Sequence, residues 1–148
     1  MRMTKYKLQL IKESSTNYGG QNINLSSPSE VYRVLCDVCD LDKQAEEVLM
    51  LICLDSKNKV IGIHEVSRGI INVSLVSGRE IFKRALLNNA AQIILAHNHP
   101  FGNPRPSDSD KEVAKNIKRA SEILNVSFID NIIVGDEVYF SFKENNMI

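Results

Sequence analysis

One stretch decides the fold of this chain, and it reads AQIILAHNHPFGNPRPSDSD from Ala91 to Asp110. Residues 91–96 form a short, largely apolar run of the kind expected for a buried strand, and His97 and His99 stand at its C-terminal end. Because strand side chains alternate, histidines at i and i+2 point to the same face, where one ion can bind both imidazoles. The stretch therefore predicts a buried strand that ends in a pair of metal ligands.

An amphipathic helix is predicted directly after this stretch, because apolar residues recur there at helical spacing: Val113, Ile117, Ala120 and Leu124. Ser107 and Asp110 occupy the N-cap and N3 positions, so a capping box and the helix dipole can account for both. Asp110 can also return its carboxylate to the histidines as a third ligand. Zinc accepts two imidazoles and one carboxylate, and a fourth position left to water is typical of a catalytic site. The alternative is that the histidines are loop residues bonded to backbone.

A base is needed to take a proton from water at such a site, and Glu65 is the candidate. It lies in an apolar, strand-like run from Val60 to Gly69, where an acid is costly to bury without a partner. A glutamate at a strand end that faces solvent is the alternative, and spacing alone leaves it open.

The rest of the chain alternates helices and strands without an internal repeat. Residues 1–28 are expected to form an N-terminal arm with an extended piece at 6–12, and residues 29–148 one domain. Within the domain we expect a helix at 29–39 with Ser29 as a possible cap, strands at 47–55 and 59–66 joined by a hairpin turn, an extended segment at 71–76, a helix at 78–90, and strands at 127–134 and 137–142. This mixture around a central hairpin indicates an α/β sandwich.

Composition fits an ordinary soluble globule of one enzyme-sized domain. The chain has 148 residues and a net charge of zero, so no overall field draws it to nucleic acid or to a membrane surface. The apolar run near the start, from Leu8 to Ile11, is too short for a signal peptide or a membrane span. We therefore expect a cytoplasmic protein.

The chain has three cysteines, Cys36, Cys39 and Cys53, and this odd number argues against a disulfide scaffold. Cys36 and Cys39 form a C-x-x-C pair, a pattern also found in redox sites and in half of a zinc site. A second pair is missing, so we interpret the cysteines as thiols of the core or of a helix surface.

Together, Glu65, His97, His99, Ser107 and Asp110 resemble the JAMM metalloprotease motif of the MPN fold. By this resemblance His97, His99 and Asp110 would bind Zn²⁺, Glu65 would be the general base, and Ser107 would help to hold the tetrahedral intermediate. The implied reaction is hydrolysis of a peptide or isopeptide bond in a peptide or protein substrate by zinc-activated water.

The surrounding sequence is similar to the bacterial RadC-like branch in particular, with EVSRG from Glu65, AHNHP from Ala96 and DNIIVG from Asp130. The resemblance spans Glu46 to Phe142. It implies an α/β MPN (JAMM) fold, in which helices sandwich a mixed sheet in a cytidine-deaminase-like three-layer arrangement.

Two residues depart from the RadC-like pattern, because Phe101 stands where serine is common and Asn131 where histidine is common. Neither is a predicted ligand, so substrate preference is affected more than metal binding. The helix-hairpin-helix segment of longer RadC-like proteins is expected to be missing.

The alternative function is a DNA-repair-associated or protein adaptor module in which the metal is structural. Basic residues on one predicted helix could contact phosphates: Lys111, Lys115, Lys118 and Arg119. Glu112 and Glu122 balance them, which favours a solvated face. A zinc deaminase is excluded, because its H-x-E and P-C-x-x-C elements are absent.

Overall fold

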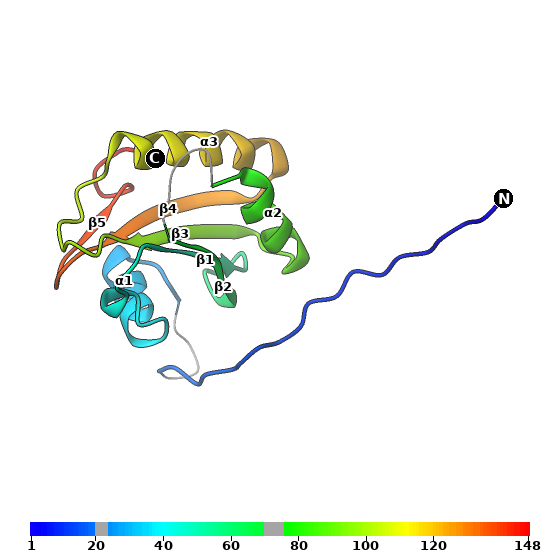
Figure 1. Ribbon diagram of the computed structural model, residues 1–148, viewed down its shortest axis with the longest axis horizontal. Helices are drawn as coiled ribbons and strands as arrows, with labels where there is room; N and C mark the ends of the chain where they lie inside the picture. The colour runs from blue at the N-terminus through cyan, green and yellow to red at the C-terminus, as the bar shows by residue number, and fades with distance from the viewer. Residues whose placement is uncertain (20–23, 70–75) are drawn as a thin grey trace.

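The structure is a computed structural model that describes residues 1–19, 24–69 and 76–148. Its centre is a five-stranded sheet in the order β2-β1-β3-β4-β5 (Figure 1). The strands are β1 (Val48–Leu54), β2 (Val60–Arg68), β3 (Gln92–Asn98), β4 (Ser127–Val134) and β5 (Tyr139–Ser141). β3 and β4 pair in parallel and the other neighbours pair antiparallel, so the sheet is mixed.

Helices cover both faces of this sheet, which makes three layers (Figure 1). The helices are α1 (Pro28–Asp37), the short 3₁₀ helix η1 (Leu41–Lys43), α2 (Gly78–Leu87) and α3 (Asp108–Leu124). One apolar cluster joins the sheet to α1, and the other joins it to α2 and α3. We call these two sides the α1 face and the α3 face. The layering confirms the predicted α/β fold with a mixed sheet between helices.

β1 shows how the sequence builds both layers at once. Every residue of this strand is buried. Leu49 and Leu51 belong to the cluster of the α3 face, whereas Met50 and Ile52 belong to that of the α1 face. A strand covered on both sides needs apolar residues at every position rather than at alternate ones, and this explains the continuous apolar run from Val48 to Leu54.

The start of α1 differs from the prediction. Its N-cap is Ser27, not Ser29: the Ser27 Oγ accepts a hydrogen bond from the Glu30 N–H, and the Glu30 carboxylate accepts one from the Ser27 N–H at 3.1 Å. Pro28 occupies the first turn, where its fixed φ suits a helix and its missing N–H has no cost. The proline therefore sets the helix start before Ser29.

Other boundaries agree with the predicted order of elements, with three qualifications. Residues 6–12 are extended but pair with no described strand, and β5 is shorter than the predicted strand at 137–142. The predicted extended segment at 71–76 lies outside the described residues except for Val76, which is buried. Among the described helices, none has the length and apolar character that crossing a membrane requires.

Candidate metal centre

His97 and His99 lie at the C-terminal end of β3, as predicted. His97 pairs with Leu49 of β1, which places its side chain on the α3 face, and it is 3% exposed. His99 follows the strand, and its N–H donates to the Val134 carbonyl at 2.8 Å. The two imidazoles converge, with 3.1 Å between their Nε2 atoms.

Asp110 reaches the same point from the first turn of α3 and is 6% exposed. It also completes a capping box with Ser107: the Ser107 N–H donates to Asp110 Oδ2 at 2.8 Å, and the Asp110 N–H donates to Ser107 Oγ at 3.1 Å. The cap holds the carboxylate in place toward the histidines. Capping and metal binding are therefore compatible roles for Asp110.

The donor atoms of these three side chains fit a metal ion. Asp110 Oδ1 lies 3.2 Å from His97 Nε2, and Oδ2 lies 3.3 Å from His99 Nε2. Zinc bonds of about 2.0 to 2.1 Å in a tetrahedron place neighbouring ligand atoms about 3.3 Å apart. His97, His99 and Asp110 form the triad of the described residues whose donor atoms lie within 4.8 Å of one another, and this group could hold a metal ion.

Hydrogen bonds around the triad orient His99 as a metal ligand. Its Nδ1 lies 2.8 Å from the Asn103 carbonyl oxygen, which can only accept, so Nδ1 carries the proton and the Nε2 lone pair of the neutral ring faces the triad. The Asp110 hydrogen bond raises the pKa of His99. Burial pushes the pKa of Asp110 up, but hydrogen bonds from His97 and His99 outweigh it and the net shift is downward. The cluster therefore stabilises a shared cation.

The loop that carries His99 is fixed from behind by the turn after β4. The Asp136 N–H donates to the Gly102 carbonyl at 2.8 Å, and a Cβ on Gly135 would collide with that carbonyl and lie 2.9 Å from Pro104 Cδ. Phe101, at the tip of this loop, is fully exposed. The phenylalanine that departs from the RadC-like pattern therefore faces solvent beside the site. The close contact between the two loops requires glycine at position 135.

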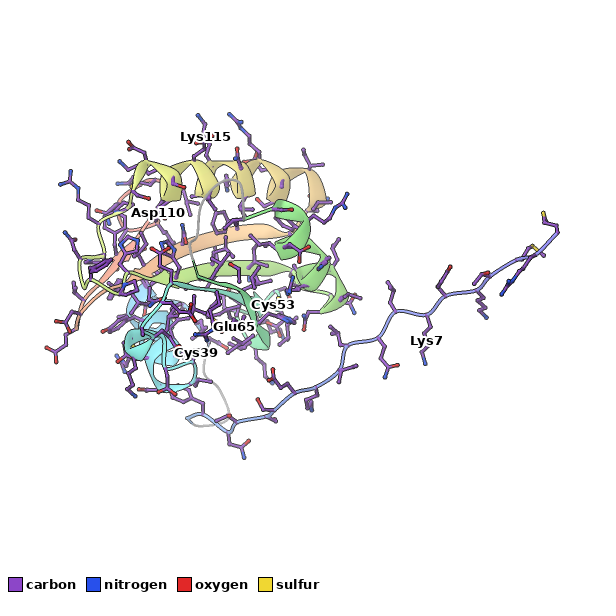
Figure 2. All side chains as sticks on the ribbon, viewed as in Figure 1. Lys7, Cys39, Cys53, Glu65, Asp110 and Lys115 are labelled. Carbon is purple, nitrogen blue, oxygen red and sulfur yellow. The ribbon has the colours of Figure 1, made fainter. Side chains whose placement is uncertain are left out.

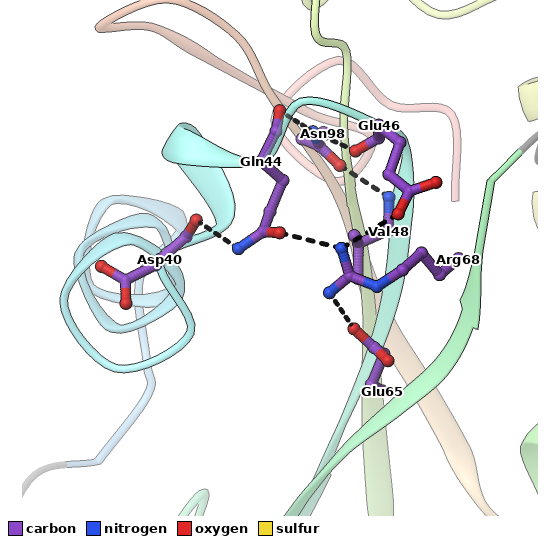
Figure 3. Close-up of polar contacts among 7 residues, drawn as sticks. All are labelled: Asp40, Gln44, Glu46, Val48, Glu65, Arg68 and Asn98. Atoms are coloured by element: carbon purple, nitrogen blue, oxygen red, sulfur yellow. Dashed lines mark hydrogen bonds and ion pairs between the residues drawn. The ribbon is translucent and has the colours of Figure 1, made fainter.

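Glu65 is not brought to the triad. It pairs with Met50, whose side chain belongs to the α1 face, so Glu65 projects from the sheet on the side opposite His97 and Asp110 (Figure 2). Its carboxylate forms an ion pair with Arg68, which also donates to Gln44 Oε1 at 3.0 Å (Figure 3). In this structure Glu65 belongs to a surface polar network, and its predicted role as general base has no geometric support.

A second acid, Glu47, lies close to His99 and was not predicted from the sequence. Glu47 directly precedes β1, two residues before Leu49, which is the partner of His97 in the sheet. Glu47 is half-buried, and its charge contributes to the raised pKa of His99. Its carbonyl accepts the Gly69 N–H at 2.8 Å, which fixes the backbone at this point. An acid directly before the most apolar strand was the available signal.

Asn98 points to the other side of β3 from the two histidines and anchors this segment. Its Oδ1 accepts the Val48 N–H at 2.8 Å, and its Nδ2 donates to the carbonyls of Glu46 at 3.0 Å and Gln44 at 3.4 Å (Figure 3). Asn98 is 2% exposed. Its side chain therefore holds the residues on both sides of Glu47 against the strand that carries the histidines.

The cysteines lie outside this centre, and all three are free thiols. Burial raises the pKa of Cys53 to about 12 and that of Cys39 to about 11. Thiols that stay protonated at neutral pH are poor nucleophiles and poor metal ligands. Cys53 lies in the core and Cys36 is a half-buried residue of α1, as expected of core or helix-surface thiols, whereas half-buried Cys39 lies in the turn after that helix.

Two other residues singled out in the sequence lie away from the triad. Lys115 points outward from α3 into solvent (Figure 2). Asn131 is 2% exposed on β4, and its Oδ1 has no hydrogen-bond partner among the described residues. The residue that replaces the common histidine is thus part of the interior rather than of the site surface.

Known proteins are similar in sequence to this chain over most of its length. A family model described as RadC-like JAB domain matches residues 25–147. A UPF0758 protein of Clostridium perfringens is 40% identical over 126 residues, which cover 85% of this chain and 55% of that protein. One of Actinobacillus pleuropneumoniae is 40% identical over 140 residues, 93% of this chain and 64% of that protein. This chain therefore spans little more than half the length of such relatives. Sequence match and mixed three-layer fold agree that the chain belongs to the RadC-like JAB domain family.

Proposed function

We propose that this domain is a zinc-dependent hydrolase of the JAMM type that cleaves a peptide or isopeptide bond. The observation that carries the proposal is the convergence of His97, His99 and Asp110 within 3.1 to 3.3 Å. The side chain of His99 is 16% exposed, so the site is reached from solvent, whereas His97 and Asp110 are buried behind it. A closed structural site has no such opening.

The three side chains of the triad would hold the ion, and a mixture of imidazole and carboxylate suits zinc. Bound zinc would supply a Lewis acid that polarises a carbonyl group and acidifies water. Side chains near the triad must then accept a proton from the water and donate one to the leaving amine.

Glu47 is the proton carrier that the geometry supports. Its carboxylate would accept a proton from the attacking water and pass it to the amine nitrogen as the carbon–nitrogen bond breaks. The water oxygen stays on the carbonyl carbon, so the products are an acid and an amine. We assign this role to Glu47 in place of Glu65, because the charge of Glu47 acts on His99, whereas Glu65 lies on the α1 face of the sheet.

Ser107 would assist at the carbonyl oxygen. Its Oγ accepts the Asp110 N–H, which leaves the hydroxyl proton free to be donated, and the residue is exposed beside the buried triad. A hydrogen bond to a developing oxyanion of this kind can contribute about 3 kcal/mol.

Metal analysis and cleavage assays test the proposal together. Untagged protein purified without chelator should contain about one zinc per chain, and His97→Ala should lose it. The loaded protein should cleave members of a quenched peptide library or isopeptide-linked peptides, with loss in a chelator and recovery on adding zinc. Protein that binds zinc but cleaves neither class, or that binds no metal, would contradict the hydrolase.

A further inference from the structure

The N-terminal part of the chain stands apart from the domain. Residues 1–17 are all exposed, and the segment runs away from the sheet to a distant N-terminus (Figure 1). We infer that residues 4–12, which we call the arm strand, add to the outer edge of β2 in a second copy of this chain. This inference is independent of the hydrolase proposal.

The arm strand has the pattern of a half-buried strand. Tyr6, Leu8 and Leu10 alternate with polar residues, so they share one face of an extended chain. They are 86%, 80% and 45% exposed, although an isolated extended segment gains nothing by presenting three large apolar side chains in register. Ile11 interrupts the alternation only near the end of the segment. Such a strand needs a sheet edge to satisfy its backbone and an apolar surface to cover its face.

Charge favours docking on the domain of this same chain. Residues 1–12 hold four basic side chains and no acidic one, and these residues are Arg2, Lys5, Lys7 and Lys12. The chain has 18 basic and 18 acidic residues, so residues 13–148 carry 14 basic against 18 acidic ones, a net charge of −4. The overall neutrality therefore conceals a positive arm and a negative domain, which attract each other between copies.

β2 is the edge that fits the arm strand. It is nine residues long, as is the segment 4–12, whereas β5 at the other edge has three. No strand of the described residues pairs with the outer side of β2. An exposed apolar side chain lies on the edge strand itself: Ile61 of β2 is 41% exposed, on the same face as Ile63. An unpaired strand edge beside apolar surface is the usual acceptor for strand addition.

The root of the arm favours exchange between two copies. Asn24 forms an antiparallel bridge with Lys59, directly before β2, so the arm leaves the domain beside that edge. Tyr18 Oη donates to Asp37 of α1 at 2.7 Å, and the chain before Tyr18 leads outward. A two-fold axis near this edge lets each arm reach the β2 of the other copy, which closes the assembly at a dimer.

Two variants with the same charge change test the arm strand. Leu8→Glu places a carboxylate on the apolar face, and Gln9→Glu places one on the opposite face. Sedimentation or light scattering over a concentration series should give the full chain and Gln9→Glu twice the 16.7 kDa chain mass, and Leu8→Glu the single mass. A monomeric full chain, or equal masses for the two variants, would overturn the inference.

Hydrogen exchange identifies the acceptor edge. Amides of residues 60–68 should exchange faster in Leu8→Glu than in the full chain or Gln9→Glu, with those of β5 unchanged. Protection that moves to β5, or an arm protected within a monomer, would contradict the β2 dimer. So would an arm that binds oligonucleotides and weakens equally in both variants. Zinc content should be the same in all three proteins, so this test fails or succeeds separately from the hydrolase proposal.

Discussion

The Asn98 Oδ1 accepts a hydrogen bond from the Val48 N–H at 2.8 Å across 50 residues of sequence. Through this bond the residue between the two histidines holds the beginning of β1. Glu47, the residue before Val48, is close enough to His99 for its charge to help raise the pKa of that histidine. The donor triad and the candidate proton carrier are thus fixed to one another by a single buried amide.

We expect Asn98→Ala to destabilise the domain while zinc binding persists. The Val48 N–H would be left buried without its partner, which costs about 1 to 3 kcal/mol. Urea unfolding measures the loss, and Asn116→Ala, at an exposed position of α3, is the control that should change stability by less than about 0.5 kcal/mol. Equal stabilities of the two variants would show that the amide does not anchor β1.

Gly135→Ala should weaken zinc binding although the residue is no ligand. Its Cβ would collide with the Gly102 carbonyl and displace the loop that carries His99. Losses of about tenfold or more are expected from such outer contacts. Competition with a chromogenic chelator gives the affinity. Gly78→Ala is the control, since its Cβ would meet no atom closer than 3.9 Å. Unchanged zinc affinity in Gly135→Ala would refute the loop argument.

Glu47→Gln and Glu65→Gln separate the two candidate bases. Both variants should fold and keep zinc, because neither residue belongs to the triad. Hydrolysis should fall by about 10²-fold or more in Glu47→Gln, which cannot accept a proton, and stay near the original rate in Glu65→Gln. The reverse result would restore Glu65 as the base and require a rearrangement of β2.

Asp110→Asn retains an oxygen for the helix cap but loses the charge that balances zinc. The cap alone predicts a cost of at most about 1 kcal/mol without metal. A ligand role predicts that added zinc raises the melting temperature much less than in the unmodified protein. Asp108→Asn, in the same helical turn but exposed, should keep the full zinc response. Equal responses of Asp110→Asn and Asp108→Asn would remove Asp110 from the site.

Zinc affinity should fall as pH is lowered. The Asp110 hydrogen bond raises the pKa of His99 above its usual 6.5, so protons compete with the metal from a higher pH than for a free histidine. Without metal the sign reverses: the His99 proton stabilises the fold below the unfolded-state pKa, and this contribution is lost as pH rises through the folded value. We expect the His99–Asp110 pair to make the free energy of unfolding rise with pH when zinc is present and fall with pH when it is absent. Urea unfolding at several pH values, with and without zinc, measures both slopes.

Sequence predicted the parts of the site that are local. β3, α3 and the donors between them lie within one short stretch, where strand alternation and helix capping decide the geometry. Local patterns mark Glu47 only as an acid directly before an apolar strand, because its nearness to His99 depends on how β1 and β3 pair. The structure places Glu65 away from the triad, and local patterns could not have indicated this: alternation within β2 says which residues share a face, but not which face meets the histidines.

All three donors lie within residues 97–110, on the two sides of one loop. Closing a loop this short costs little chain entropy, so the same side chains can meet around a metal even before the domain folds. Three of the four prolines of the chain lie in this loop and restrict it further. If the proposed zinc site is correct, we therefore expect zinc to bind the unfolded chain as well, so that the metal stabilises the native state by less than its affinity for the folded protein implies.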